Sequence, residues 1–366
     1  MSKHFKWAIP ALIAAVGSIH ANSVATAQPQ PEASKLAPAN PNAVYLASPS
    51  YTFQMGFTAL ILQPTGSYLH YAAQANPLPA PSPNWKIHDI ETDYHFGFDA
   101  ELSGIFHGTN SDLTLDWEHF HSEDSAHKST PSSQMIGPFF EIGPDASPYK
   151  KARGHATFHF DQVNLDYGQY VNIGNRLQAN LFAGVGYARI KETLHSRYSD
   201  GTGAIVRTIN VPSQFTGAGP QIGLDFNYRI VKGFQFVGQT MASLFVGTMK
   251  NHTKFKAFSP ALAGVGVTPP NVQRTKVHHR TQVVPGFEGK LGLAYAYDFK
   301  RHYRIKLEAG YQAQIYLNAI QSADIGSEVV TPPVAPDTVG VYARTFQRVL
   351  SNFALAGPYI TLDLGF

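Results

Sequence analysis

The stretch QIGLDFNYRIVKGFQFVG, residues 221–238, decides the fold class. Its apolar residues alternate with small or polar ones, so that Ile222, Leu224 and Phe226 share one face while Gly223 and Asp225 share the other. A helix would need apolar residues at a period near 3.6, whereas the period here is two. A short glycine-containing turn separates two such runs, so the stretch predicts a β-hairpin.

The same alternation recurs along the chain from residue 51 to the last residue. We predict about ten strands, within a range of eight to twelve, that form an antiparallel up-and-down β-barrel across a membrane. The predicted strands lie near residues 51–62, 92–104, 111–120, 154–168, 176–194, 215–230, 234–249, 282–299, 303–318 and 353–366.

The connections between these strands alternate between long and short. The connection between the first two predicted strands is long and rich in proline. Further long segments are predicted at 121–153, 195–214, 250–281 and 319–352, and short turns lie between them. Outer-membrane barrels have short periplasmic turns and longer outer loops, so both ends of the barrel domain are expected on the periplasmic side. A soluble β-sandwich would not require this regular asymmetry.

The composition agrees with a barrel that shows one face to lipid and one to water. Charged residues make up 14%, aromatic residues 12%, and the mean hydropathy is −0.16. No run of about eighteen apolar residues follows the N-terminal segment, so no helical span is expected. Without Lys3 and Lys6 the chain has 26 basic and 25 acidic residues, which is not the charge balance of a nucleic-acid-binding protein.

The first residues have the pattern of an export signal. Lys3, His4 and Lys6 precede an apolar run, and Ala25-Thr26-Ala27 matches the small-x-small pattern of a cleavage site. We therefore expect a signal peptide at 1–27, a flexible segment rich in Pro and Ala at 28–50, and the barrel at 51–366. The expected location is the outer membrane, in contact with its lipid and lipopolysaccharide.

The final strand ends on an aromatic residue. Ile360, Leu362, Leu364 and Phe366 alternate with polar or small residues. A terminal aromatic residue on such a strand is similar to the signal that outer-membrane proteins present to the barrel-assembly machinery. We therefore expect Phe366 to be an assembly signal and that machinery to be a partner.

Several stretches resemble the Legionella major outer membrane protein family. They are FTALILQPTGSYLHYA, RLQANLFAGVGYARIKETL, FTGAGPQIGLDFNYRIVKGFQFVGQTMASLFVG, LEAGYQAQIYLNAI and YITLDLGF. The resemblance covers roughly residues 51 to 366 and implies a pore-forming outer-membrane barrel. Some members of the family form assemblies crosslinked by cysteine, and this chain has no cysteine with which to form one.

The predicted inner face carries nearly all the charge of the strands. Crowded carboxylates in a lumen repel each other, so they need cations, water or basic partners across the barrel. These residues either line a polarised pore or form an ion-paired plug. A barrel of about ten strands is compatible with both alternatives. The predicted pore-lining residues are Asp99, Glu101, Asp116, Glu118, Arg229, Glu288, Lys290, Arg304, Lys306 and Glu308.

The sequence offers two other candidate sites outside the lumen, a metal site and a catalytic site. Histidines in HFHSEDSAH (119–127) and the pair His278-His279 have spacings that a metal site could use, but no second ligand cluster accompanies them. Omptin-type proteases use Asp and His at the outer rim of ten strands, and His119, His121, Asp124 and Asp89 could lie there. The omptin pattern is not recognisable, so we expect no enzyme, no metal and no cofactor.

The leading prediction is passive passage of small hydrophilic solutes or ions. The alternative is a surface adhesion or interaction protein, in which long outer loops on an occluded barrel bind host-surface ligands. A charged inner face rich in glycine favours the pore, whereas long loops on a narrow barrel favour adhesion.

Overall fold

The computed structural model describes residues 51–66, 69–75, 86–106, 108–131, 134–138, 149–257, 271–276, 278–299, 303–330 and 340–366. The expected signal peptide and the segment 28–50 lie outside these residues. No helix among the described residues is long and apolar enough to cross a membrane.

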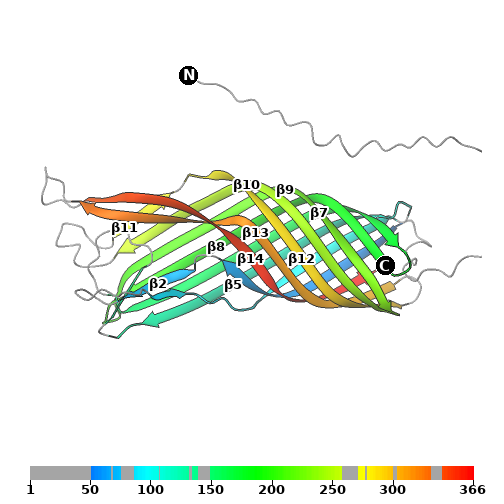
Figure 1. Ribbon diagram of the computed structural model, residues 1–366, viewed down its shortest axis with the longest axis horizontal. Helices are drawn as coiled ribbons and strands as arrows, with labels where there is room; N and C mark the ends of the chain where they lie inside the picture. Colours follow the sequence, from blue (N-terminus) through cyan, green and yellow to red (C-terminus); the bar gives the residue numbers. More distant parts are fainter. Residues whose placement is uncertain are drawn as a thin grey trace, which may run out of the picture. The chain divides into compact units, whose positions relative to one another are not determined.

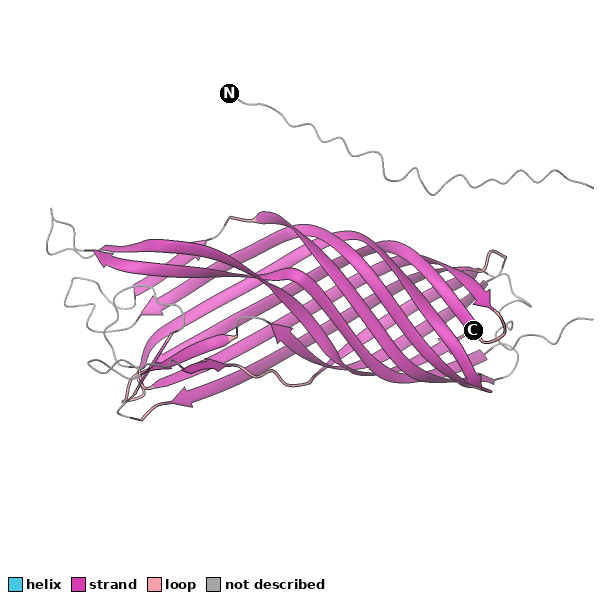
Figure 2. Cartoon of the chain, viewed as in Figure 1, coloured by secondary structure: helices cyan, strands magenta, loops and turns pink. Residues whose placement is uncertain are grey.

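Ten long antiparallel strands form a closed ring, which confirms the predicted fold class (Figures 1 and 2). Closure is made by the pairing of β14 with β1, in which Gln54 lies opposite Gly365 and Gly66 opposite Phe353. A closed ring leaves no unpaired strand edge within the membrane. In ring order the strands are β1 (Tyr51–Gly66), β4 (His95–Phe106), β5 (Ser111–Ser129), β7 (Lys151–Ile173), β8 (Leu177–Ser199), β9 (Ile205–Val231), β10 (Phe234–Ala257), β12 (Arg280–Phe299), β13 (Tyr303–Val330) and β14 (Gly340–Gly365).

Short turns gather at one end of the barrel, together with the C-terminus (Figure 1). We call this the inner end and the opposite one the outer end. The turn between β9 and β10 contains Gly233 at a φ of +83°, a conformation that favours glycine. The backbones of Phe53 and Phe366 exchange two hydrogen bonds of 3.0 Å at the inner end, so the last residue continues the seam between β1 and β14.

Four shorter strands lie outside the ring. Three form a small sheet from the connections that follow β1 and β5, and the fourth extends the wall beside β10. They were not predicted from the sequence. They are β2 (His70–Ala75), β3 (Lys86–Asp89), β6 (Met135–Gly137) and β11 (Asn271–Lys276).

Most ring strands are longer than predicted. β7 and β8 have 23 residues each and β9 has 27, whereas about ten residues suffice to cross a membrane. The predicted long loop at 195–214 is wrong, because β8 and β9 continue to a turn at Asp200–Ala204. The predicted loop at 319–352 is largely occupied by β13 and β14.

The outward face changes character along a single row of paired residues. One row of paired, outward-facing apolar residues crosses six neighbouring strands. The next outward-facing row toward the outer end consists of polar residues. The apolar row consists of Trp117, Val163, Tyr187, Ala218, Val246 and Val283, and the polar row of His119, Asp161, Arg189, Thr216, Thr248 and Thr281. Lipid-facing strands require apolar residues, so we place the outer membrane boundary on β8, β9 and β10 near the change from the first row to the second.

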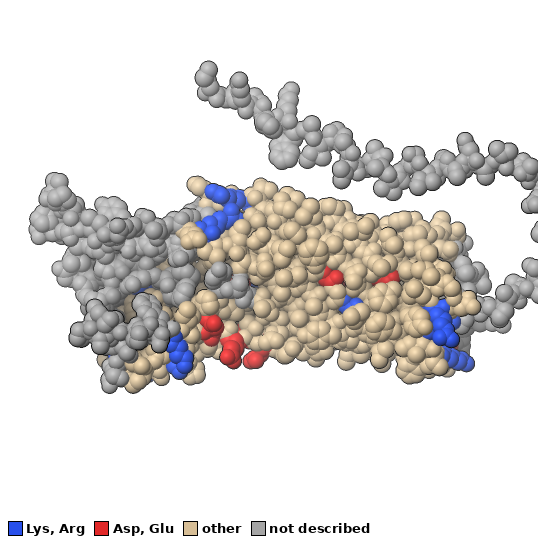
Figure 3. Space-filling model, in the orientation of Figure 1, with Lys and Arg blue, Asp and Glu red and all other residues tan. Residues whose placement is uncertain are grey.

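The apolar face changes from the outside of the wall to the inside across this boundary. On β8, Val185 and Tyr187 are exposed on the outside, whereas further along Ile190, Leu194 and Tyr198 are buried inside. Beyond the membrane the outer surface faces water and the apolar residues pack within the barrel. The face in Figure 3 agrees, since charged side chains gather toward the two ends and only small patches appear in the middle.

Candidate functional site: a charged lumen below an aromatic constriction

The inner half of the barrel encloses a set of ionisable side chains that we call the charged lumen. Every predicted pore-lining residue lies at an inward-facing position of its strand. These positions alternate with the exposed ones and include buried residues such as Asp99 and Gln312. Carboxylates outnumber cations within it. The acidic members are Asp99, Glu101, Asp112, Asp116, Glu118, Asp166, Asp225, Glu288, Glu308 and Asp363, and the basic members are Arg229, Lys290, Arg304 and Lys306.

Polar contacts cross the lumen from wall to wall. Lys290 Nζ on β12 lies 3.2 Å from Asp99 Oδ2 on β4. Gln314 Nε2 on β13 donates to Glu118 Oε1 on β5 at 2.7 Å. These strands are separated by three others around the ring in the shorter direction, so the lumen is narrow enough for side chains to bridge it.

A second ion-paired group lies beside the closing seam. Lys306 Nζ is 2.7 Å from Glu308 Oε2 and 3.2 Å from Asp363 Oδ2 on the neighbouring strand. Tyr359 Oη donates to Glu308 Oε1 at 2.6 Å. Arg304 lies closer to the inner rim, with its Nε 3.6 Å from Asp298 Oδ1.

Several buried polar atoms of the charged lumen have no hydrogen-bond partner among the described residues. They include Asp99 Oδ1 and Asp225 Oδ1. A carboxylate oxygen that is neither hydrogen-bonded nor hydrated costs free energy, so groups of this kind favour a lumen reached by water or cations.

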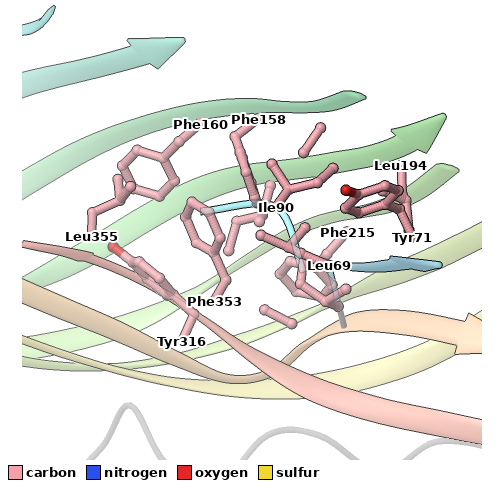
Figure 4. Packing of buried hydrophobic residues seen from close by; sticks show 14 of the residues in the cluster. Leu69, Tyr71, Ile90, Phe158, Phe160, Leu194, Phe215, Tyr316, Phe353 and Leu355 are labelled. Carbon is pink, nitrogen blue, oxygen red and sulfur yellow. The ribbon is translucent and has the colours of Figure 1, made fainter. Parts of the chain in front are cut away.

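Apolar side chains form a buried cluster in the outer half of the lumen. Five aromatic residues from β7, β10, β13 and β14 meet inside the barrel, and we call them the aromatic constriction. Figure 4 labels Phe158, Phe160, Tyr316 and Phe353 among them. Ring centroids are 5.4 Å apart for Phe160 and Tyr316, 5.9 Å for Phe160 and Phe353, and 6.3 Å for Phe245 and Tyr316. The members are Phe158, Phe160, Phe245, Tyr316 and Phe353.

Tyr316 joins the constriction to the charged lumen. Its ring packs among the phenylalanines, while its hydroxyl lies 2.5 Å from both Glu288 Oε1 and Gln162 Oε1. The lining of the lumen therefore changes from charged to apolar at Tyr316.

Two described stretches of the connection between β1 and β4, residues 69–75 and 86–94, contribute side chains to the same cluster. Leu69, Tyr71 and Ile90 are buried in the same apolar cluster (Figure 4). The Tyr198 hydroxyl of β8 donates to the backbone oxygen of Tyr71. Gly154 makes room for this segment, because a Cβ there would lie 2.6 Å from Tyr71 Cγ.

The histidines weighed as metal or catalytic residues do not converge. His119 and His121 lie on the outside of β5, where His119 Nδ1 is 2.7 Å from Asp161 Oδ1 and His121 stacks on His159. Asp124 points inward to His95 Nε2 at 2.9 Å. Within the described ranges, no three His, Cys, Asp or Glu side chains are placed to share a metal ion.

The sequence prediction missed some members of the charged lumen. Asp225 and Asp363 belong to the inward-facing set of their predicted strands, so the same alternation identifies them. The aromatic constriction was also missed. Its sequence signal is the shift of the apolar residues from one face of the strand to the other, as on β7 between Phe160 and Val163.

Comparison with known proteins gives one family match. The family model of the Legionella pneumophila major outer membrane protein precursor matches residues 47–366. A comparison with curated proteins finds no match.

A comparison with solved structures finds matches at low sequence identity and low structural similarity. The outer membrane protease OmpT from Escherichia coli is 11% identical, with 86% of this chain and 96% of that chain covered and a TM-score of 0.41. The Pseudomonas putida toluene transporter TodX is 8% identical, with coverages of 89% and 91% and a TM-score of 0.31. The translocator domain of the autotransporter NalP from Neisseria meningitidis is 8% identical, with coverages of 87% and 88% and a TM-score of 0.31.

Proposed function

We propose a pore function for this chain, which belongs to the Legionella pneumophila major outer membrane protein family and is an outer-membrane β-barrel. The proposed activity is passive passage of small hydrophilic solutes or ions, with a preference for cations and with the aromatic constriction as the gate. The observation that carries the proposal is the excess of carboxylates in the lumen directly below an apolar constriction.

The cation preference rests on fixed charge. Asp99, Asp116 and Glu118 lie on adjacent strands, with Asp99 opposite Glu118 and Asp116 opposite Glu101 in the register. Rings of acidic side chains make pores selective for cations, because fixed charges in a narrow passage are weakly screened.

The gate rests on the aromatic packing. Hydrophobic constrictions in channels close by excluding water, without a charged or bulky plug. Opening would require that the rings of Phe160, Tyr316 and Phe353 separate, or that the segment with Tyr71 leaves the barrel mouth. We therefore expect rare openings of the wild-type barrel.

Single-channel recording in planar bilayers tests this proposal. Phe353→Ala removes one ring of the constriction and should raise the fraction of time in which the channel is open. Phe215→Ala removes an equally buried phenyl ring from the part of the cluster nearer Leu69 (Figure 4) and should leave the recording close to that of the wild type. If neither the wild type nor Phe353→Ala conducts, the gate and the pore are both wrong.

A second candidate is an interaction protein on an occluded barrel, with host-surface ligands as partners. The same constriction favours it, because its buried aromatic side chains lie where a pore must open. A barrel that stays silent in both recordings would leave this candidate standing. We propose no catalysis, since His119 and Asp124 point to opposite faces of β5.

A further inference from the structure

Three basic side chains lie close together on the outside of the barrel, next to the outer membrane boundary. Arg189 follows the lipid-facing Tyr187 on β8, and Lys191 follows Arg189 at the next outward position. Lys250 lies two strands away in the same row as Lys191, since Gln214 pairs with both. We call Arg189, Lys191 and Lys250 the basic patch.

The patch continues toward the outer end with residues of the same sign. Arg197 and Lys254 occupy outward positions further along β8 and β10. On the face shown in Figure 3, one blue group lies toward the outer end, near the place where Figure 1 labels β10.

The strands β8, β9 and β10 place no carboxylate beside the basic patch. Between Leu177 and Ala257 the acidic residues are Glu192 and Asp225, which point inward, and Asp200, which lies in the turn. On the neighbouring strand β7, Asp161 lies opposite Arg189 in the register, and its Oδ1 is 2.7 Å from His119 Nδ1. None of the three cations of the patch forms an ion pair with a described carboxylate.

Hydrogen-bond donors fill the positions between the cations. Thr216 and Thr248 continue the row of Arg189, and Gln214 separates Lys191 from Lys250. With about 4.8 Å between neighbouring strands, Lys191 and Lys250 start roughly 10 Å apart across the wall. Long side chains over this span can reach two anionic groups of one headgroup.

We propose that the basic patch binds the phosphate groups of a phosphorylated glycolipid in the outer leaflet, the chemistry of lipopolysaccharide. The apolar row with Tyr187 and Val246 lies directly below and would contact the acyl chains of the same molecule. Cations beside a lipid surface attract anionic headgroups, and phosphate accepts from Arg, Lys and Thr side chains. This site is independent of passage through the lumen.

The test measures binding of purified lipopolysaccharide to the refolded barrel in detergent, by native mass spectrometry. Three further probes are used: the same glycolipid after enzymatic removal of its phosphates, inorganic phosphate, and a soluble sulfated polysaccharide. We expect lipopolysaccharide to bind and each of the other three to bind at least about tenfold more weakly, because the site needs phosphate and acyl chains together.

The decisive variant is Arg189→Gln/Lys191→Gln/Lys250→Gln. It should bind lipopolysaccharide roughly 10- to 100-fold more weakly than the wild type. The control Lys128→Gln/Arg176→Gln/Lys232→Gln removes the same charge elsewhere and should bind as the wild type does. Both variants should retain the heat-dependent mobility of a folded barrel in electrophoresis.

Three results would overturn the inference. They are equal binding by the patch variant and the control, equal binding of the glycolipid without phosphates, and equal binding of the soluble polysaccharide. The last would assign the patch to a polyanion in solution. None of these results bears on conductance, so this site and the pore can fail separately.

Discussion

Lys290 on β12 reaches across the lumen to Asp99 on β4, with 3.2 Å between Nζ and Oδ2. The contact joins two walls of the barrel at the level where carboxylates are most crowded. Asp99 keeps one oxygen without a partner among the described residues, so the lysine does not satisfy the site. The balance of charge in the lumen therefore stays acidic.

Lys306→Met should destabilise the barrel by about 3 kcal/mol, because it leaves Glu308 and Asp363 beside each other without their cation. The triple variant Lys306→Met/Glu308→Gln/Asp363→Asn removes the whole group and should recover most of the loss. Urea unfolding of the refolded barrel in detergent measures both. A single variant as stable as the wild type would show that the ion pairs are not formed.

Substitution by arginine should lower the unfolding free energy by different amounts on the two faces of β9. Leu224→Arg places a charge toward lipid and should cost about 2–4 kcal/mol near the membrane midplane. Asn227→Arg points into the lumen, on the same face as Asp225, and should cost much less. Gly223 is unsuitable for this comparison, since a Cβ there would lie 2.1 Å from Phe182 Cζ. Equal unfolding free energies would mean that the faces are assigned wrongly.

Phe366→Ala should lower the amount of barrel inserted in cells and leave the stability of the refolded barrel nearly unchanged. The substitution removes the exposed ring but keeps the two backbone hydrogen bonds to Phe53. Deletion of the residue would remove both, so it is the poorer test. Heat-modifiable barrel in the outer-membrane fraction is the readout, and a normal amount would count against an assembly role.

The outer turn between β8 and β9 should loosen in acid. Thr202 Oγ1 donates to Asp200 Oδ1 at 2.7 Å, and the amides of Thr202 and Ala204 donate at 2.9 and 3.1 Å. These bonds lower the pKa of Asp200 below its usual value. The bonds therefore stabilise the turn above the ordinary carboxyl pKa, and this stabilisation is lost as the pH falls through the lowered one. The amide resonance of Thr202 should follow that titration, and a shift centred at or above an ordinary carboxyl pKa would refute it.

The ring and its faces could be predicted because lipid on one side and the lumen on the other enforce a strict period of two. Leu293, Tyr295 and Tyr297 are exposed, as the alternation requires. The strand ends could not be predicted in the same way. Beyond Tyr187 the outward residues become polar while Ile190 and Leu194 turn inward, so the apolar face that marks a membrane strand is lost although the strand continues.

The charged lumen was predictable in outline and the constriction was not. Each ionisable residue could be placed on the inner face by its position in a strand. Contacts such as Phe160 with Tyr316 join residues far apart in sequence, and they depend on the tilt and register of the closed ring. The seating of Tyr71 against Gly154 depends in addition on the path of a connecting segment.

The reversal potential in a salt gradient tests the central claim most directly, that the carboxylates of the lumen control ion passage. It is measured in the Phe353→Ala background with and without Asp99→Asn/Asp116→Asn. The potential should indicate cation preference before the change and shift toward anions after it, more so at low salt. A potential that does not move when these two carboxylates are neutralised, or a barrel that never conducts, would contradict the account.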